Sequence, residues 1–90
     1  MGMITQGGGY KNRTDTGVVS ANAGTLLGFY VNSTSSGTLV LKDGTASAGT
    51  AISGTITPAI GWHTYPASFA TGLYATIANT LNVTFIFAPG

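Results

Sequence analysis

The sequence predicts an all-β protein: a compact antiparallel β-sandwich or jelly roll of about seven short strands. Threonine, valine, isoleucine and aromatic residues, which favour pleated strands, fill its apolar segments. No segment repeats its apolar residues with the helical period of about 3.6. Turn residues such as Gly, Asn and Asp separate the segments at intervals of roughly 8–12 residues. At 90 residues, the chain is long enough for one domain with one hydrophobic core.

The beginning of the chain differs from the rest. We expect residues 1–16 to form a flexible N-terminal arm, and residues 17–90 to form the β-sandwich domain. Gly7-Gly8-Gly9 restricts the backbone very little, which suits a linker better than a packed strand. Three of the five charged side chains follow this glycine run, and they are Lys11, Arg13 and Asp15. The arm is therefore expected to contact a partner.

The alternation that is typical of strands begins at Gly17. The segment at residues 25–32 carries apolar side chains on both faces, which indicates a central strand or one that lies beneath another subunit. Strict alternation places Leu27, Phe29 and Val31 on one face, and Leu26 and Tyr30 on the other. Residues Ser33–Gly37 are expected to form a turn after this strand.

Six further strands are expected, at residues 18–19, 38–42, 51–57, 62–65, 72–77 and 81–87. Asp43-Gly44 is expected to close a tight turn, because glycine readily adopts positive φ. Asn79-Thr80 is expected to be the hairpin connection between the last two strands. In the last strand, period-two geometry places four side chains on one face: Leu81, Val83, Phe85 and Phe87.

The small number of charges excludes several kinds of function. Charged side chains make up 6% of the residues, against about 25% in a typical soluble domain. A formal net charge of +1 provides no field that would attract nucleic acid or an anionic membrane. Cysteine is absent, and His63 is the only histidine, with no acidic residue near it in sequence. The sequence therefore predicts no metal site, no cofactor and no enzymatic activity.

Signals for export and modification are also weak. The start of the chain lacks the basic and apolar regions of a signal peptide, and no apolar run reaches the roughly 18–20 residues of a membrane span. We therefore expect synthesis in a cytoplasm without secretory export. Three Asn-x-Ser/Thr triplets begin at Asn12, Asn32 and Asn82. In a threonine-rich chain they are interpreted as chance matches and not as glycosylation sites.

The aromatic residues allow two interpretations. Trp62, Tyr65 and Tyr74 could line a platform for a sugar, or they could belong to the core or to a subunit interface. Tyr10 is different, because it lies in the charged arm, where an aromatic anchor suits contact with a partner. Within the arm, the residues expected to make this contact are Tyr10, Lys11 and Arg13.

Six short motifs follow one another along the β domain. They are Gly17-Val18-Val19, Gly24-Thr25-Leu26-Leu27-Gly28-Phe29-Tyr30-Val31-Asn32, Gly37-Thr38-Leu39-Val40-Leu41-Lys42-Asp43-Gly44, Gly49-Thr50-Ala51-Ile52, Tyr65-Pro66 with Phe69 and Gly72-Leu73-Tyr74, and Leu81-Asn82-Val83-Thr84. In their order and spacing they resemble small virion proteins of tailed bacteriophages. The resemblance covers about the last four-fifths of the chain.

This resemblance implies a β-sandwich decoration, or cement, protein on the outer surface of a phage head. Such a protein would bind the major capsid protein, bridge neighbouring subunits and stabilise the shell. It would be made in the host cytoplasm and become part of the virion, without a nucleic-acid, membrane or cofactor partner. The resemblance also implies self-association, for which we prefer a homotrimer to a dimer. We place the oligomer interface around Tyr30 and Phe87.

A second function fits the same sequence. The chain could be a carbohydrate-binding or adhesin module of a phage tail or fibre. Its binding platform would then consist of Trp62, Tyr65 and Tyr74.

Overall fold

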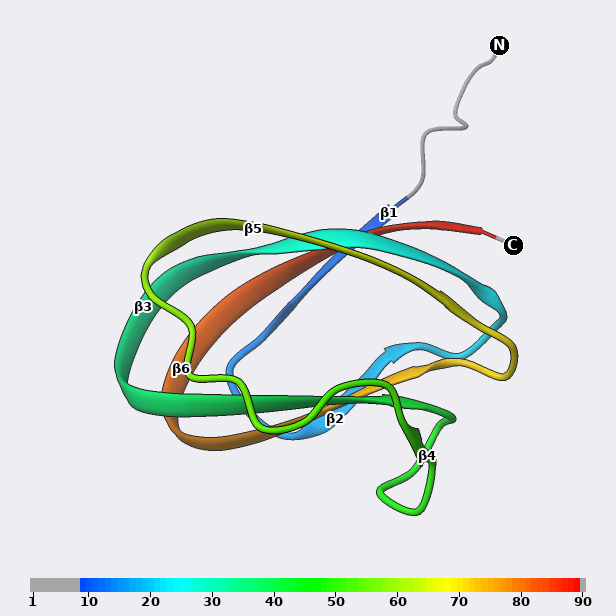
Figure 1. Ribbon diagram of the computed structural model, residues 1–90, viewed down its shortest axis with the longest axis horizontal. Coiled ribbons are helices and arrows are strands. Elements are labelled where there is room, and N and C mark those ends of the chain that lie inside the picture. Colours follow the sequence, from blue (N-terminus) through cyan, green and yellow to red (C-terminus); the bar gives the residue numbers. More distant parts are fainter. Residues whose placement is uncertain (1–8, 90) are drawn as a thin grey trace, which may run out of the picture.

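The structure is a computed structural model that describes residues 9–89, and these residues form one antiparallel sheet of six strands without any helix (Figure 1). The prediction of an all-β fold is therefore confirmed. The strands are β1 (Gly9–Arg13), β2 (Gly17–Ser20), β3 (Gly24–Asp43), β4 (Thr50–Ala51), β5 (Gly61–Phe69) and β6 (Leu73–Pro89). The first eight residues of the predicted arm lie outside the described residues.

The two long strands β3 and β6 pair along their whole length and organise the sheet. Their register runs from Gly24 opposite Pro89 to Asp43 opposite Leu73. Both strands bend midway, so that the ribbon they form folds back and its two ends lie opposite each other (Figure 1). We call the end that pairs with β5 and β1 half A, and the end that pairs with β4 and β2 half B.

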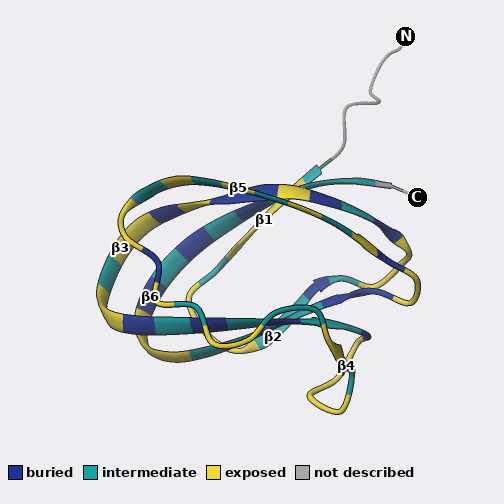
Figure 2. Cartoon of the chain, viewed as in Figure 1, coloured by how far each residue is buried: buried dark blue, intermediate teal, exposed yellow. Residues whose placement is uncertain are grey.

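The hydrophobic core lies between the two halves. Buried and exposed residues alternate along β3 and β6, as period-two geometry requires (Figure 2). The buried apolar residues come from both halves and form one cluster: Val19, Leu26, Phe29, Val31, Leu39, Leu41, Phe69, Leu73, Ala75, Leu81, Val83 and Phe85. Phe87 packs against this cluster, so the prediction that Leu81, Val83, Phe85 and Phe87 share one face is confirmed.

The predicted faces of the segment at residues 25–32 are partly wrong. Leu26 is fully buried, whereas Leu27 is 40% exposed, so that Leu26 and not Leu27 joins Phe29 in the core. The cause is a register shift between Leu26 and Gly28, which occurs against both β5 and β6. An irregularity of this kind inverts the side-chain alternation on one side of it, and the sequence alone does not reveal where it occurs.

The prediction of about seven strands is also wrong, because two expected turns are bends inside continuous strands. Residues Ser33–Gly37 lie within β3, and Asn79-Thr80 lies within β6, so neither forms a hairpin whose two flanking segments pair with each other. Ser36 and Asn79 both have positive φ, 55° and 60°, and the Asn79 side chain donates a hydrogen bond to the Ser36 carbonyl at 2.8 Å. Serine, glycine and asparagine therefore bend the two paired strands at the same place.

The predicted flexible arm is wrong for residues 9–13. These residues form β1, which pairs with β6 from Gly9 opposite Phe87 to Arg13 opposite Val83. Gly9 lies against the Phe87 ring, where a Cβ atom would be 3.7 Å from the ring carbons. The glycine that was expected to loosen the chain instead fits a strand against an aromatic side chain.

Asp43 stabilises a connection that is distant from it in sequence. Its carboxylate accepts hydrogen bonds from the backbone N–H groups of Ala70 at 2.8 Å, Thr71 at 2.9 Å and Gly72 at 3.4 Å, which lie between β5 and β6. The bonds from Ala70 and Thr71 hold the pKa of Asp43 below its usual value, because they stabilise the charged carboxylate. The tight turn expected at Asp43-Gly44 is wrong, because a loop of six residues, 44–49, separates β3 from β4. The Gly44 N–H instead donates to the Gly72 carbonyl at 2.9 Å.

Replacing Asp43 with asparagine should remove most of the acid sensitivity of the fold. A carboxylate whose pKa is lowered by folding contributes stability above its unfolded pKa of about 3.9, and this contribution is lost as the pH falls through the folded value. Urea unfolding from about pH 6 to pH 2.5 should therefore show a fall for the wild type and a flatter profile for Asp43→Asn. Asp15→Asn, which keeps Asp43, should still show the fall. Equal slopes for the wild type and Asp43→Asn would contradict this role.

Gly37→Ala should destabilise the bend. A Cβ atom at Gly37 would lie 2.5 Å from the Thr80 carbonyl oxygen and 2.7 Å from the Leu81 Cβ. We expect a loss of about 1–3 kcal/mol in the free energy of unfolding, measured by urea denaturation. Gly54→Ala is the matched control, because no atom lies within 4 Å of a Cβ there. Equal stability of the two variants would show that the bend tolerates a side chain.

Candidate binding face

The large exposed apolar side chains of the described residues gather at one half of the molecule. Tyr10, Leu27, Tyr30 and Trp62 belong to strands of half A, and Ile60 lies just before β5. Tyr10, Tyr30 and Trp62 are 76%, 45% and 48% exposed. Exposed aromatic residues grouped in this way mark a surface that binds a ligand or a partner. The candidate binding surface is therefore the outer face of half A, which is the face turned away from half B.

Trp62 is the centre of this face. Along β5, exposed residues alternate with partly buried ones, and Trp62 and Thr64 point outward. The indole Nε1 donates a hydrogen bond to the Thr64 hydroxyl at 2.9 Å. The ring also reaches over β3, where a Cβ atom at Gly28 would lie 2.6 Å from the indole Cζ2. Glycine at position 28 thus provides the space for the indole.

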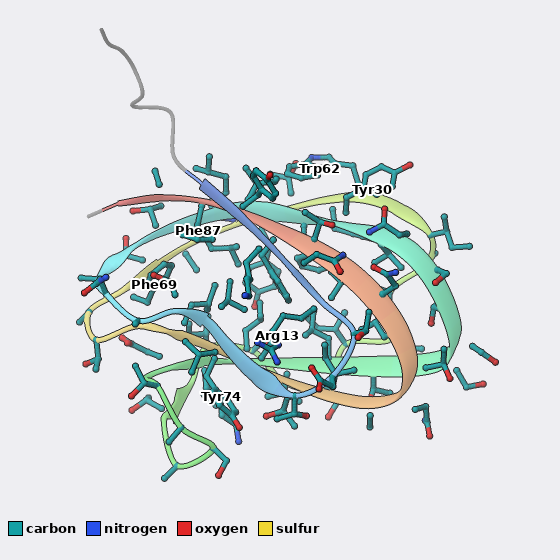
Figure 3. All side chains as sticks on the ribbon, turned by 180° about the vertical axis from the view of Figure 1, so that it is seen from behind. Arg13, Tyr30, Trp62, Phe69, Tyr74 and Phe87 are labelled. Carbon is teal, nitrogen blue, oxygen red and sulfur yellow. The ribbon has the colours of Figure 1, made fainter. Side chains whose placement is uncertain are left out.

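Two tyrosines extend the aromatic surface across the sheet. Tyr30 lies opposite Trp62 of β5 and opposite Thr84 of β6. Tyr10 lies opposite Ile86, two residues further along β6 than Thr84. Figure 3 shows Tyr30 and Trp62 together on the outer side of the sheet. The outer face therefore carries aromatic side chains on three strands: β5, β3 and β1.

Four polar side chains form a hydrogen-bonded group beside these aromatics, which we call the amide cluster: Asn12, Asn32, Asn82 and Thr84. The Asn12 Nδ2 donates to Asn82 Oδ1 at 2.7 Å and to Thr84 Oγ1 at 3.0 Å. From the other side of β6, the Asn32 Nδ2 donates to the same two atoms at 3.2 Å and 3.1 Å. The three asparagines of the Asn-x-Ser/Thr triplets thus meet on one face.

These bonds fix which polar groups of the amide cluster remain unused. Within residues 9–89, the Oδ1 atoms of Asn12 and Asn32 and the Nδ2 of Asn82 have no hydrogen-bond partner, and the Thr84 hydroxyl makes no bond as a donor. The free group is therefore an acceptor on β1 (Asn12), a donor on β6 (Asn82) and an acceptor on β3 (Asn32). Sequence patterns do not predict this arrangement, because it depends on the register shift between Val31 and Ser33 that places Asn32 beside β6.

The charged side chains of β1 lie on the other side of the strand. Lys11 and Arg13 alternate with Tyr10 and Asn12 and pair with the inward-facing Phe85 and Val83. Lys11 is exposed. Arg13 is used within the fold: its Nη2 contacts the Asp15 carboxylate at 2.8 Å, and its Nη1 donates to the Val18 carbonyl at 3.1 Å. Arg13 thus links β1 of half A to β2 of half B.

The predicted sugar platform of Trp62, Tyr65 and Tyr74 does not exist as one surface. Tyr65 is partly buried against the core, with its ring centroid 6.4 Å from that of Phe29. Tyr74 lies on half B, opposite Lys42. Residues 62 and 65 are an odd number of positions apart on one strand, which places them on opposite faces. Tyr30 and Phe87 are likewise separated, because the Phe87 ring lies on the core side (Figure 3).

His63 packs within the fold. Its ring stacks on Phe29 with centroids 5.2 Å apart, and its Nε2 lies 2.8 Å from the Ala59 carbonyl oxygen. Within residues 9–89, no three His, Cys, Asp or Glu side chains are grouped as metal ligands would be. The same residues include no helix of the length and apolar character that crossing a membrane requires. The outer face of half A carries aromatic rings that can stack on a ligand and amide groups that can form hydrogen bonds with it, as a binding surface requires.

No protein-family model, no curated protein and no solved structure matches this chain. The observation that bears on function is therefore the geometry of the outer face, and the resemblance to phage virion proteins stays a prediction from the sequence.

Arg13→Met should destabilise the protein, whereas Lys11→Met should not. The two residues lie on the same strand and the same face, but only Arg13 is bonded to the turn that leads to β2. We expect a loss of about 1–3 kcal/mol for Arg13→Met, because its hydrogen bonds involve a charged group. Lys11→Met should stay within about 0.5 kcal/mol of the wild type. Thermal and urea unfolding would measure both, and equal effects would contradict the linking role of Arg13.

Proposed function

We propose that this protein is a structural component of a tailed-phage virion that decorates the capsid. It would bind the outer surface of the head, bridge major capsid protein subunits and stabilise the shell. The resemblance of residues 17–90 to small virion proteins supports this proposal. We further infer that the folded sheet functions as a small β-sandwich of the jelly-roll type. Its two halves, closed over one core, would form the rigid body that such a role needs.

The observation that carries the proposal is the exposure of Tyr10 on an edge strand. Tyr10 is 76% exposed, and among residues 9–89 the only strand that pairs with β1 is β6. A strand with a free edge presents unpaired N–H and C=O groups that can accept a strand of another protein. Lys11 is exposed next to Tyr10. We therefore place the shell contact at β1, with Tyr10 and Lys11 as contact residues and with Arg13 supporting the strand from within.

Stabilisation would arise from the repetition of a modest contact. A protein that binds the assembled shell, but not the separated subunits, stabilises the shell by the free energy of its binding. When one copy binds two subunits, the second contact forms at a high effective concentration, so the two contacts together bind more tightly than either alone. Self-association as a homotrimer remains part of the proposal, but without Phe87, whose ring packs against the core. Tyr30 is exposed and can still contact a copy.

Tyr10→Ala should weaken binding to empty phage heads at least about tenfold, because aromatic anchors dominate interface energies. Co-sedimentation of the purified protein with heads that lack it would measure this affinity. Ile60→Ala is the matched control: Ile60 is 64% exposed and precedes β5, at the edge of half A opposite to β1. It should bind like the wild type.

Two results would overturn the proposal. If the wild-type protein does not bind the heads, the decoration function is wrong. If it binds and Tyr10→Ala binds equally well, decoration stands but the contact is not at β1. Light scattering of the free protein would give the number of copies in the oligomer and thereby test the trimer.

A further inference from the structure

Trp62 and the amide cluster lie on either side of Tyr30, and the shell contact proposed for Tyr10 and Lys11 uses none of their side chains. Tyr30 connects them, because it lies opposite Trp62 on one side and opposite Thr84 of the cluster on the other. We propose that this part of the outer face binds a neutral saccharide. The proposal goes beyond capsid decoration and uses neither of the shell-contact residues, Tyr10 and Lys11. It assigns Tyr30 to a sugar instead of to a neighbouring copy.

The free polar groups of the amide cluster match the hydroxyl groups of a sugar. The Oδ1 atoms of Asn12 and Asn32 can accept hydrogen bonds, and the Asn82 Nδ2 between them can donate. A sugar hydroxyl both donates and accepts, so two neighbouring hydroxyls can bond to an acceptor and a donor that lie side by side. A protein surface seated on the same groups would have to match each of them with a fixed donor or acceptor, or leave it unsatisfied at a cost.

The aromatic rings supply the apolar half of the site. A pyranose ring has an apolar face of C–H groups, which packs on an exposed indole or phenol ring. Trp62 and Tyr30 are each about half exposed and lie on neighbouring strands next to the amide cluster. Ligand sites in proteins combine such apolar surface with a few oriented polar groups.

The charges of this face restrict the ligand to a neutral one. The five charged side chains of the chain are Lys11, Arg13, Asp15, Lys42 and Asp43. None belongs to the outer face of half A, since Lys11 and Arg13 point to its other side and Lys42 and Asp43 belong to half B. Asp15 lies in the turn after β1 and contacts Arg13. Carboxylated or sulfated sugars would find no cation here.

The site is also ordered before any ligand arrives. The Trp62 indole is held by its bond to Thr64 and by its fit over Gly28. Asn12 and Asn32 are held by their bonds to Asn82 and Thr84. Binding would therefore not have to order these side chains, which reduces its entropic cost.

The test is a titration of the full-length protein with neutral oligosaccharides, using cello-, malto-, xylo-, galacto- and chito-oligosaccharides, and with sialyllactose and oligogalacturonate as acidic probes. Trp62 is the only tryptophan, so its fluorescence reports on the site directly. Calorimetry would measure the affinities of variants that lack it. We expect saturable binding of at least one neutral probe and no binding of the acidic probes.

Two variants should weaken this binding without unfolding the protein. Trp62→Ala removes the exposed ring and should weaken binding at least about tenfold. Asn82→Asp keeps the oxygen that accepts from Asn12 and Asn32 but removes the outward donor, and it should weaken binding by a similar factor. Asn22→Asp is the matched control, because it adds the same charge at an exposed position of the turn after β2 and should bind like the wild type.

The proposal is wrong if no neutral probe binds, if only acidic probes bind, or if Trp62→Ala and Asn82→Asp bind as the wild type does. It is also wrong if the face instead mediates self-association, seen as an oligomer that Trp62→Ala dissociates while no sugar binds. Head binding by Trp62→Ala and Asn82→Asp should be unchanged. This readout separates failure of the saccharide site from failure of capsid decoration.

Discussion

The continuous pairing of β3 with β6 is the constraint on which the rest of the structure depends. Every other strand uses one of these two as its partner: β4 and β5 pair with β3, and β1 and β2 pair with β6. Because the paired strands bend together, one ribbon supplies both walls of the core. A core of this kind needs no disulfide, and the chain has no cysteine. Its stability comes instead from apolar burial between the halves and from backbone hydrogen bonds.

Folding the ribbon on itself gives each half one inner and one outer face. The inner faces are apolar, and the edge between the halves is closed by Arg13, which reaches from β1 to the β2 backbone. The outer face of half A differs from a typical solvent-exposed sheet surface. It carries aromatic rings and amides where most proteins would place charged side chains. This difference is the physical basis for assigning recognition to half A.

The sequence was a good guide to strand content and a poor guide to connectivity. Alternation along residues 81–87 correctly predicted that four side chains share one face, because the extra residues of the two register shifts opposite this segment lie on β3. At Leu26 and Leu27 a shift inverted the faces, and at Asn79-Thr80 a bend had the same residue signals as a hairpin. Both conformations use residues that tolerate positive φ, so local composition cannot distinguish them. Whether such residues form a bend or a hairpin depends on which strand the flanking residues pair with.

The candidate site was predictable only in part, for a related reason. Trp62 and Tyr30 were identified as candidates for binding, but they were assigned to different surfaces. The amide cluster joins residues 12, 32 and 82, which meet only once three strands are aligned. Tyr65 does not share a face with Trp62, because the two residues are three positions apart on β5. Recognition surfaces on sheets run across strands, whereas sequence patterns are read along them.

The long separation in sequence between paired residues determines how the protein can fold as it is synthesised. Gly24 pairs with Pro89, and Gly9 pairs with Phe87. Neither β1 nor β3 has its main partner until β6 has left the ribosome, and before then β3 can pair only with β4 and β5. Folds dominated by such distant contacts form slowly, since the entropy of closing a long loop must be overcome first. During that interval the small number of charges leaves little electrostatic repulsion between nascent chains. Aggregation is therefore avoided only if the sheet is completed quickly.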